Sequence, residues 1–253
     1  MKTIAIIAQK GGTGKTTTAH ALGAGLERRG KKTLLIDLDA QGNLSYIARA
    51  DAGQTGAFEV LTQQATATQA IQRRRGQPDV IAAGPSLAGA DLVITQAGKE
   101  YRLRDALQPL ERAYDVCIID SPPALGILTI NALTASTTAI VTAQADIFSL
   151  QAIGALAATV DAIRRHTNPA LAIGGILLTR YNPRTILSRD ITDMMKDAAA
   201  TLQTRIYKAR IRECTALKEA QAMKRDIFAY AKRSNAAADY DAFIDELRQG
   251  ARI

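Results

Sequence analysis

Residues Thr3–Thr17 read TIAIIAQKGGTGKTT, and this stretch decides the fold. The apolar run Thr3–Ala8 predicts a buried strand, and the pattern from Thr17 to Arg29, closed by Gly30, predicts a helix. Glycines between them let backbone N–H groups surround phosphate oxygens, and the helix N-terminus adds partial positive charge. A strand, a glycine-rich loop and a helix in this order predict a phosphate-binding loop.

The loop also supplies side chains that suit a nucleoside triphosphate. Lys15 can reach the β- and γ-phosphates, and the Thr16 hydroxyl can ligate Mg²⁺. We therefore expect ATP and Mg²⁺ as cofactors. The residues expected to contact the nucleotide are Lys10, Gly11, Gly12, Thr13, Gly14, Lys15, Thr16 and Thr17.

Apolar runs alternate with helix-length segments along the rest of the chain. Further strands are predicted at Thr33–Leu38, Asp115–Asp120, Ala139–Ala143 and Leu171–Thr179. Apolar strands separated by helices predict an α/β fold with a mostly parallel twisted sheet, covered by helices on both faces. We expect a single domain over residues 1–253, without an N-terminal helix-turn-helix. The polar segment 65–76, which ends in Arg73, Arg74 and Arg75, is expected to be an exposed excursion on the rim.

Carboxylates follow two of the predicted strands. The segment LLIDLDAQGN places Asp37 and Asp39 at the end of one strand, where alternation puts both on one face, toward the same crevice. A carboxylate near Mg²⁺ and the γ-phosphate can orient the attacking water. The segment VCIIDSPPALG places Asp120 directly after four apolar residues.

The loop departs from the common pattern G-x-x-x-x-G-K-[ST], because Gln9 stands at its first position and a second lysine, Lys10, follows. In this respect the sequence resembles the deviant Walker A ATPases, the ParA/Soj and MinD family of P-loop NTPases. The resemblance implies that Lys10 reaches across an ATP-dependent homodimer to the partner's nucleotide. It makes Lys10, Lys15 and Asp39 the catalytic residues. It also makes Asp120 the Walker B aspartate that holds Mg²⁺ together with Thr16.

The resemblance covers nearly the whole chain, but its match includes departures. Asp39 falls in a segment similar to the family's D-x-D-P-Q-G-N, with Ala40 in place of the proline. Where many members read I-P-R-N-V-R-L-S-E-A, this chain has Arg212, Glu213 and Ala216 in place of the proline and both arginines. Adenine contacts are expected near Thr179, Arg180 and Arg212.

The net charge of +8 is concentrated in one segment. Residues 150–235 contain 15 Lys and Arg against 7 Asp and Glu, whereas residues 1–149 contain 15 against 13. Such asymmetry favours a polyanion-binding face, although a solvated basic surface has the same composition. The resemblance adds non-specific DNA as a partner, contacted by Arg184. Because Ala216 stands at the family's second contact, the neighbours Arg210, Arg212 and Lys218 are expected to replace it.

The resemblance implies an ATP-dependent DNA or plasmid partition ATPase. Its ATP-bound dimer would bind DNA without sequence preference, and a ParB-like centromere-binding adaptor would stimulate hydrolysis. The protein would then be cytoplasmic and nucleoid-associated, with no membrane partner.

Three alternatives compete with this interpretation. A MinD-like ATPase that positions cargo on a membrane needs a basic amphipathic terminal helix. Here the stripe Tyr240, Phe243, Ile244 and Leu247 lies beside acidic residues, so we expect it to dock on the core. No apolar run approaches the ~18 residues of a membrane span. The positions of Cys117 and Cys214 disfavour a redox ATPase of the nitrogenase iron-protein type, and the carboxylates disfavour a non-enzymatic scaffold.

Overall fold

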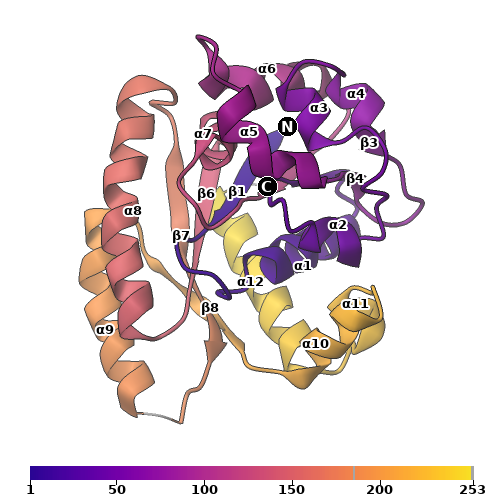
Figure 1. The fold of residues 1–253 in the computed structure, drawn as a ribbon. Helices are drawn as coiled ribbons and strands as arrows, with labels where there is room; N and C mark the ends of the chain where they lie inside the picture. The colour runs from indigo at the N-terminus through magenta and orange to yellow at the C-terminus, as the bar shows by residue number, and fades with distance from the viewer. Residues whose placement is uncertain (185, 252–253) are drawn as a thin grey trace.

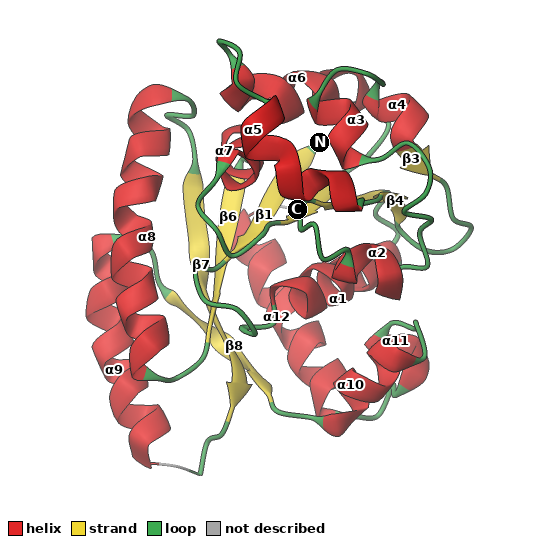
Figure 2. Cartoon of the chain, viewed as in Figure 1, coloured by secondary structure: helices red, strands yellow, loops and turns green. Residues whose placement is uncertain are grey.

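The computed structural model describes residues 1–184 and 186–251, which form one eight-stranded sheet. The strand order is β3-β4-β2-β5-β1-β6-β7-β8 (Figures 1 and 2). Neighbouring strands pair in parallel except β3 and β4, which are antiparallel. The strands are β1 (Lys2–Ile7), β2 (Thr33–Asp37), β3 (Ile71–Gln72), β4 (Asp79–Ile81), β5 (Val116–Asp120), β6 (Thr138–Ala143), β7 (Ala172–Tyr181) and β8 (Ile206–Arg212). The predicted α/β fold is confirmed.

The central strands are buried on both faces, as continuous apolar runs require. In β1, Ile4 and Ile6 belong to one hydrophobic cluster, and Ala5 and Ile7 belong to the other. Alternate side chains of a strand point to opposite faces, so each strand contributes to two separate cores. The sheet therefore needs a layer of helices on each side.

Helices supply these two layers. The first covers the face that includes Ala5 and Ile7, with α3 (Ala57–Leu61), α4 (Ala67–Ala70), α5 (Ala90–Val93), α6 (Arg102–Leu107), α7 (Ile127–Ala135), α8 (Ile147–His166) and α9 (Ile186–Thr201). The second covers the opposite face, with α1 (Lys15–Glu27), α2 (Asn43–Ile47), α10 (Thr215–Ala222), α11 (Ile227–Tyr230) and α12 (Asn235–Ala251). Three short 3₁₀ turns also occur, at Pro85–Gly89, Lys99–Tyr101 and Gln108–Leu110.

The predicted boundaries lie within two residues of those observed. The helix expected at Thr17–Arg29 begins at Lys15 and ends at Glu27. It starts earlier because Gly14, in the left-handed conformation with φ 79°, is already its N-cap. Gly30 (φ +80°) closes the following turn, where its N–H bonds the Glu27 carbonyl.

The segment 65–76 is more ordered than an exposed excursion, and that expectation is corrected. It contains α4, which Thr66 caps by accepting a hydrogen bond from the Gln69 N–H, and β3, which pairs with β4. Ala67 and Ala70 are buried. The turn after β3 is where Arg73 and Arg75 are exposed.

Helix α12 packs against α1 and β8, which confirms the docking expected from its apolar stripe. Tyr240, Phe243, Ile244 and Leu247 are all at most 2% exposed. Its carboxylates also bind the edge strand. Glu246 accepts hydrogen bonds from the backbone N–H groups of Lys208 (3.1 Å) and Ala209 (3.0 Å), and Asp239 accepts one from Arg212 (3.0 Å). The edge strand β8 is therefore partly sealed by side chains.

One helix in the described part of the chain, α8, is long and apolar enough to cross a membrane, with mean hydropathy 1.3 over its most apolar stretch. It is not a continuous apolar run, because polar residues such as Gln151 and Asp161 interrupt it, and helices that pack on a core pass the same test of length and composition. Ile153, Leu156, Val160 and Ile163 of α8 are buried against the sheet.

Candidate nucleotide-binding site

The phosphate loop joins β1 to α1 at the carboxyl edge of the parallel strands. Gly12 (φ +75°) and Gly14 (φ +79°) both adopt the left-handed conformation, which L side chains rarely adopt. No side chain caps the N-terminus of α1, so its first N–H groups are free to bind an anion. The local backbone thus forms the anion cradle that the sequence predicts.

Strands β6 and β7 hold this loop in place from behind. The Thr179 hydroxyl donates to the Thr13 carbonyl at 2.7 Å, and the hydroxyls of Thr13 and Thr142 lie 3.0 Å apart. Gln144 donates from Nε2 to the Gly12 carbonyl at 2.9 Å. Thr179, expected near adenine, is 2% exposed and fixes the loop backbone.

Lys15 lies on the inner side of the loop and faces carboxylates. Burial lowers its pKa, while the charges of Asp120 and Asp39 oppose that shift. Its ammonium makes no hydrogen bond or ion pair with any residue that the structure describes. A buried ammonium without a direct partner can receive phosphate oxygens.

Asp120, at the end of β5, is completely buried, and among the described residues neither of its carboxylate oxygens has a hydrogen-bond partner. Burial, followed by the charge of Asp37, raises its pKa well above the ordinary value, and Thr16 and Lys15 act in the opposite direction. Buried polar groups are normally satisfied, so two orphaned oxygens need an explanation. A hard cation beside Thr16 would provide it, because Mg²⁺ prefers oxygen ligands.

Asp37 and Asp39 have different environments, although alternation put both on one face. Asp39 lines the nucleotide cavity, and its Oδ1 accepts the Gln41 N–H at 3.0 Å. Asp37 is buried and accepts 2.8 Å hydrogen bonds from the N–H and the hydroxyl of Ser45. Burial is the main cause that raises the pKa of Asp37 to about 6. Asp37 thus orders the turn into α2 and does not line the cavity, which corrects the expectation for that residue.

The second loop lysine, Lys10, is held on the outer side of the loop. Its ammonium forms a 2.6 Å ion pair with Asp146 and lies 5.7 Å from the centre of the Phe148 ring. Partial burial opposes ionisation of Asp146, but hydrogen bonds from Lys10 and Ser149, with the Lys10 charge, hold its pKa below the ordinary value. Asp146 is also the N-cap of α8. Lys10 therefore points to α8 within its own chain.

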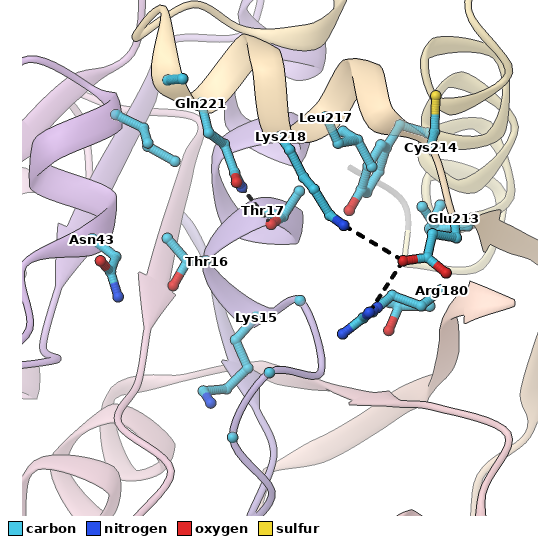
Figure 3. Close-up of a pocket in the computed structure, with 18 of the residues that line it drawn as sticks. Lys15, Thr16, Thr17, Asn43, Arg180, Glu213, Cys214, Leu217, Lys218 and Gln221 are labelled. Atoms are coloured by element: carbon cyan, nitrogen blue, oxygen red, sulfur yellow. Dashed lines mark hydrogen bonds and ion pairs between the residues drawn. The ribbon is translucent and has the colours of Figure 1, made fainter.

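A cavity of about 560 Å³ extends from this loop (Figure 3). At its far end Glu213 lies between Arg180 (3.1 Å) and Lys218 (3.7 Å), and α10 supplies Gln221, which donates to the Thr17 hydroxyl at 2.7 Å. Its lining includes Gly11, Gly12, Gly14, Lys15, Thr16, Thr17, Asp39, Asn43, Tyr46, Pro123, Thr179, Arg180, Arg212, Glu213, Cys214, Leu217, Lys218 and Gln221. All three residues expected near adenine lie in this lining.

The residues expected to contact DNA differ in how they are held. Arg184 is exposed, in the turn between β7 and α9. Arg210 donates to the Tyr181 hydroxyl and stacks on its ring at 4.5 Å. Arg212 is paired with Asp239 at 2.6 Å, and Lys218 with Glu213. The structure does not bring these four side chains into a single cluster of unpaired cations.

Several residues that shape the site were missed from the sequence. Asp146, Gln144, Thr142 and Gln221 contact the loop from positions more than 120 residues away, and no local motif marks them. One signal was available: Asp146, a residue type favoured at the N-cap, begins the helix-length segment that follows the strand predicted at Ala139–Ala143, and in the structure it accepts the Ser149 N–H. Its second role, toward Lys10, depends on the fold.

Comparison with known proteins agrees with this geometry. A family model described as an AAA domain matches residues 1–173. The chain is 38% identical to the sporulation initiation inhibitor protein Soj of Bacillus subtilis, over 94% of this chain and 95% of that protein. It is 36% identical to the chromosome partitioning protein ParA of Caulobacter vibrioides, over 91% and 87%.

A solved structure is also similar to this chain over nearly its whole length. The cobyrinic acid a,c-diamide synthase from Mycobacterium smegmatis, with bound ATP analogue and magnesium, superposes with a TM-score of 0.84 at 33% identity. The superposition covers 98% of this chain and 95% of that one. The identities, the coverage and the loop geometry together show that this chain belongs to the ParA/Soj family of P-loop ATPases.

Proposed function

We propose that this protein is a Mg²⁺-dependent partition ATPase, whose ATP-bound dimer binds DNA without sequence preference. The observation that carries the nucleotide part is the buried, unpartnered Asp120 beside a loop with two lysines. The similar Mycobacterium smegmatis structure holds an ATP analogue and magnesium, which supports both cofactors.

The residues present fit Mg²⁺-ATP. Gly11, Gly12, Thr13 and Gly14 would bind phosphate oxygens through backbone N–H groups, and Lys15 would reach the β- and γ-phosphates. Thr16 and Asp120 would hold Mg²⁺, which supplies charge neutralisation for the phosphates when bound. Thr17 and Arg212 complete the proposed nucleotide contacts.

Asp39 is the proposed water-orienting group for hydrolysis. It lies at the cavity surface, and only its Oδ1 has a hydrogen-bond partner in the described residues. The carboxylate is therefore available to accept a hydrogen bond from water. Lys15 would stabilise charge on the phosphates during the same step.

Dimerisation provides a use for Lys10 that a single chain lacks. Lys15 already serves the loop, whereas Lys10 is directed outward to Asp146. In the proposed ATP dimer, Lys10 leaves Asp146 and contacts the nucleotide of the partner. The ion pair with Asp146 is then the resting arrangement of the nucleotide-free chain.

DNA and an adaptor complete the proposed cycle. Arg184, Arg210, Arg212 and Lys218 are the proposed DNA contacts, and a dimer doubles their number. Its relatives Soj and ParA support a cytoplasmic, nucleoid-associated protein and a ParB-like adaptor that stimulates hydrolysis. The apolar face of α12 is buried against the core, and its more exposed residues Asp241 and Asp245 are acidic, so this helix gives no support to membrane attachment.

A mobility-shift titration of the wild type and Arg184→Ala on two unrelated DNA duplexes tests this proposal. With ATP, we expect the wild type to bind both duplexes alike and far more tightly than with ADP. Arg184→Ala should weaken binding to both while leaving ATP binding unchanged. Equal affinity of the wild type with ATP and ADP would contradict the proposal.

A further inference from the structure

A second group of cations lies at the opposite end of the sheet from β8. The turn between β3 and β4 carries Arg73, Arg74 and Arg75, and Arg49 follows α2 beside it. We call these four residues the hairpin arginine cluster. They line a surface hollow of about 410 Å³ together with Gln72 and Gln77. Figure 1 shows β3 and β4 on the side away from α8 and α9.

None of these four guanidinium groups is paired with a carboxylate in the described residues. By contrast, Arg180, Arg205, Arg212 and Lys218 in the basic segment 150–235 all have such partners. The nearby carboxylate Asp79 is engaged by the Arg74 N–H and by the Tyr114 hydroxyl. The hairpin arginine cluster is thus a concentration of unneutralised positive charge.

The fold holds these cations together despite their repulsion. Arg49 donates to the carbonyls of Lys224 (3.0 Å) and Met223 (3.3 Å), which directs its side chain across the surface. Arg74 is half-buried, and its pKa is lowered by burial and then by the charge of Arg49. Arg73 and Arg75 are exposed on either side of it. An anion placed in the hollow would relieve this repulsion.

We propose that the hairpin arginine cluster binds phosphates of the DNA backbone, independently of the nucleotide state. This inference rests on the proposed function, because it adds a second contact with the same polyanion. Guanidinium groups suit phosphate, since each presents paired donors to its oxygens. The hollow offers no apolar side chain to a lipid, and its open rim of exposed arginines suits an extended backbone.

The position of the turn that carries Arg73, Arg74 and Arg75 supports a contact that does not depend on ATP. The turn precedes β4, which runs parallel to β2, so the turn lies at the amino ends of the parallel strands. The phosphate loop lies at the opposite, carboxyl edge. No residue of the hairpin arginine cluster lines the nucleotide cavity or pairs with Lys10. The chain after hydrolysis would therefore keep a weak hold on DNA.

Salt titrations of duplex binding, with ATP, with ADP and without nucleotide, test this inference on the full-length protein. The variant is Arg73→Ala/Arg75→Ala. Its matched control, Lys2→Ala/Arg112→Ala, removes the same charge from two exposed residues that lie outside both the hairpin arginine cluster and the basic segment 150–235. We expect the hairpin variant to bind roughly tenfold more weakly at low salt in all three states. Its log–log salt slope should shrink by about 2.

Each outcome separates this inference from the proposed function. Loss in the hairpin variant but not in the control supports the inference, even if ATP brings no increase and the proposed function fails. Unchanged binding by the hairpin variant, with ATP-dependent binding that Arg184→Ala abolishes, overturns only the inference. Equal losses in variant and control also overturn it, because net charge alone would then explain them. Stronger binding to phosphatidylglycerol vesicles than to DNA would overturn the choice of DNA.

Discussion

Lys15 and Asp39 line the same cavity but face different parts of the proposed reaction. Lys15→Ala should weaken ATP binding, because the buried ammonium that meets the phosphates is lost. Asp39→Ala should keep ATP binding yet hydrolyse it roughly 10²-fold more slowly, because only the water-orienting carboxylate is missing. Equilibrium binding of a fluorescent ATP analogue and phosphate release, with DNA and adaptor present, measure the two effects.

Asp51→Ala is the control for this pair, since Asp51 is an exposed aspartate outside the cavity. It should behave as the wild type in both assays. Wild-type turnover by Asp39→Ala would show that another group orients the water.

The same region shows which site residues a sequence can reveal. Glycines at left-handed positions and a lysine at a helix N-terminus are local requirements, so Gly12, Gly14 and Lys15 were predictable. Asp37 was not, because alternation fixes the face of a side chain but not its partner. Ser45, eight residues further along, engages Asp37, and only Asp39 remains at the cavity.

At the scale of elements, α1 and α12 approach closely at Gly25. A Cβ added there would overlap the Cδ1 atom of Ile244 and lie 3.2 Å from the Phe228 ring, and both side chains are buried. Gly25→Ala should destabilise the fold by roughly 1–3 kcal/mol through overpacking. Thermal denaturation followed by circular dichroism measures this change.

Gly154→Ala in α8 is the matched control, because in the described part of the chain no atom beyond the neighbouring residues and backbone of its own helix lies within 4 Å of the added Cβ. Removing a helical glycine there should raise stability by roughly 0.5–1 kcal/mol. If both variants melt alike, the close packing between α1 and α12 is not what restricts Gly25.

A half-buried histidine in α1, His20, makes the free energy of unfolding depend on pH. Burial, opposed by the charge of Asp226 and assisted by that of Arg74, lowers the pKa of His20 to about 4; Lys224 lines the same small cavity. As the pH falls below about 6.5, His20 binds a proton in the unfolded chain, whereas in the folded chain it stays neutral until about pH 4. The contribution of neutral His20 to the free energy of unfolding is therefore fully present above about pH 6.5 and is lost as the pH falls toward about 4.

Urea denaturation of the wild type and His20→Gln between pH 7.5 and 4.5 tests this effect. The wild type should lose on the order of 3 kcal/mol more than the variant over this range. Parallel pH profiles for the two proteins would mean that His20 titrates alike in the folded and unfolded chains.

The sequence predicted the long buried strands but not the short elements at the sheet edge. Long apolar runs such as β1 and β5 are buried on both faces, so composition alone identified them. In the polar segment 65–76, neither α4 nor β3 was predicted. A two-residue strand such as β3 shows no alternation of apolar and polar residues, and its pairing with β4 depends on the tertiary fold.

At the scale of the whole molecule, the Lys10–Asp146 ion pair should oppose dimerisation. Breaking the pair by Asp146→Asn keeps an effective N-cap on α8 but removes the charge that holds Lys10. In the Asp39→Ala background with ATP, this variant should form dimers at lower protein concentration than Asp39→Ala alone. Adding Lys10→Ala to the same background should give monomers. Sedimentation velocity distinguishes the species.

Asp161→Asn, an exposed substitution on the same helix, is the control and should not change the dimerisation midpoint. A dimer of equal stability without ATP, or one unaffected by Lys10→Ala, would contradict a role for this lysine between chains.

The contacts between α12 and β8 affect how copies of this protein can approach one another. An edge strand with free N–H groups is a template onto which another chain can add a strand, and this route leads to aggregation. Here Glu246 and Asp239 occupy N–H groups of Lys208, Ala209 and Arg212, and they place negative charge along that margin. A strand approaching from a neighbouring copy would have to displace both carboxylates and leave them desolvated. Copies of the chain bound side by side on one polymer would therefore be hindered from adding strands to one another along this partly occupied edge.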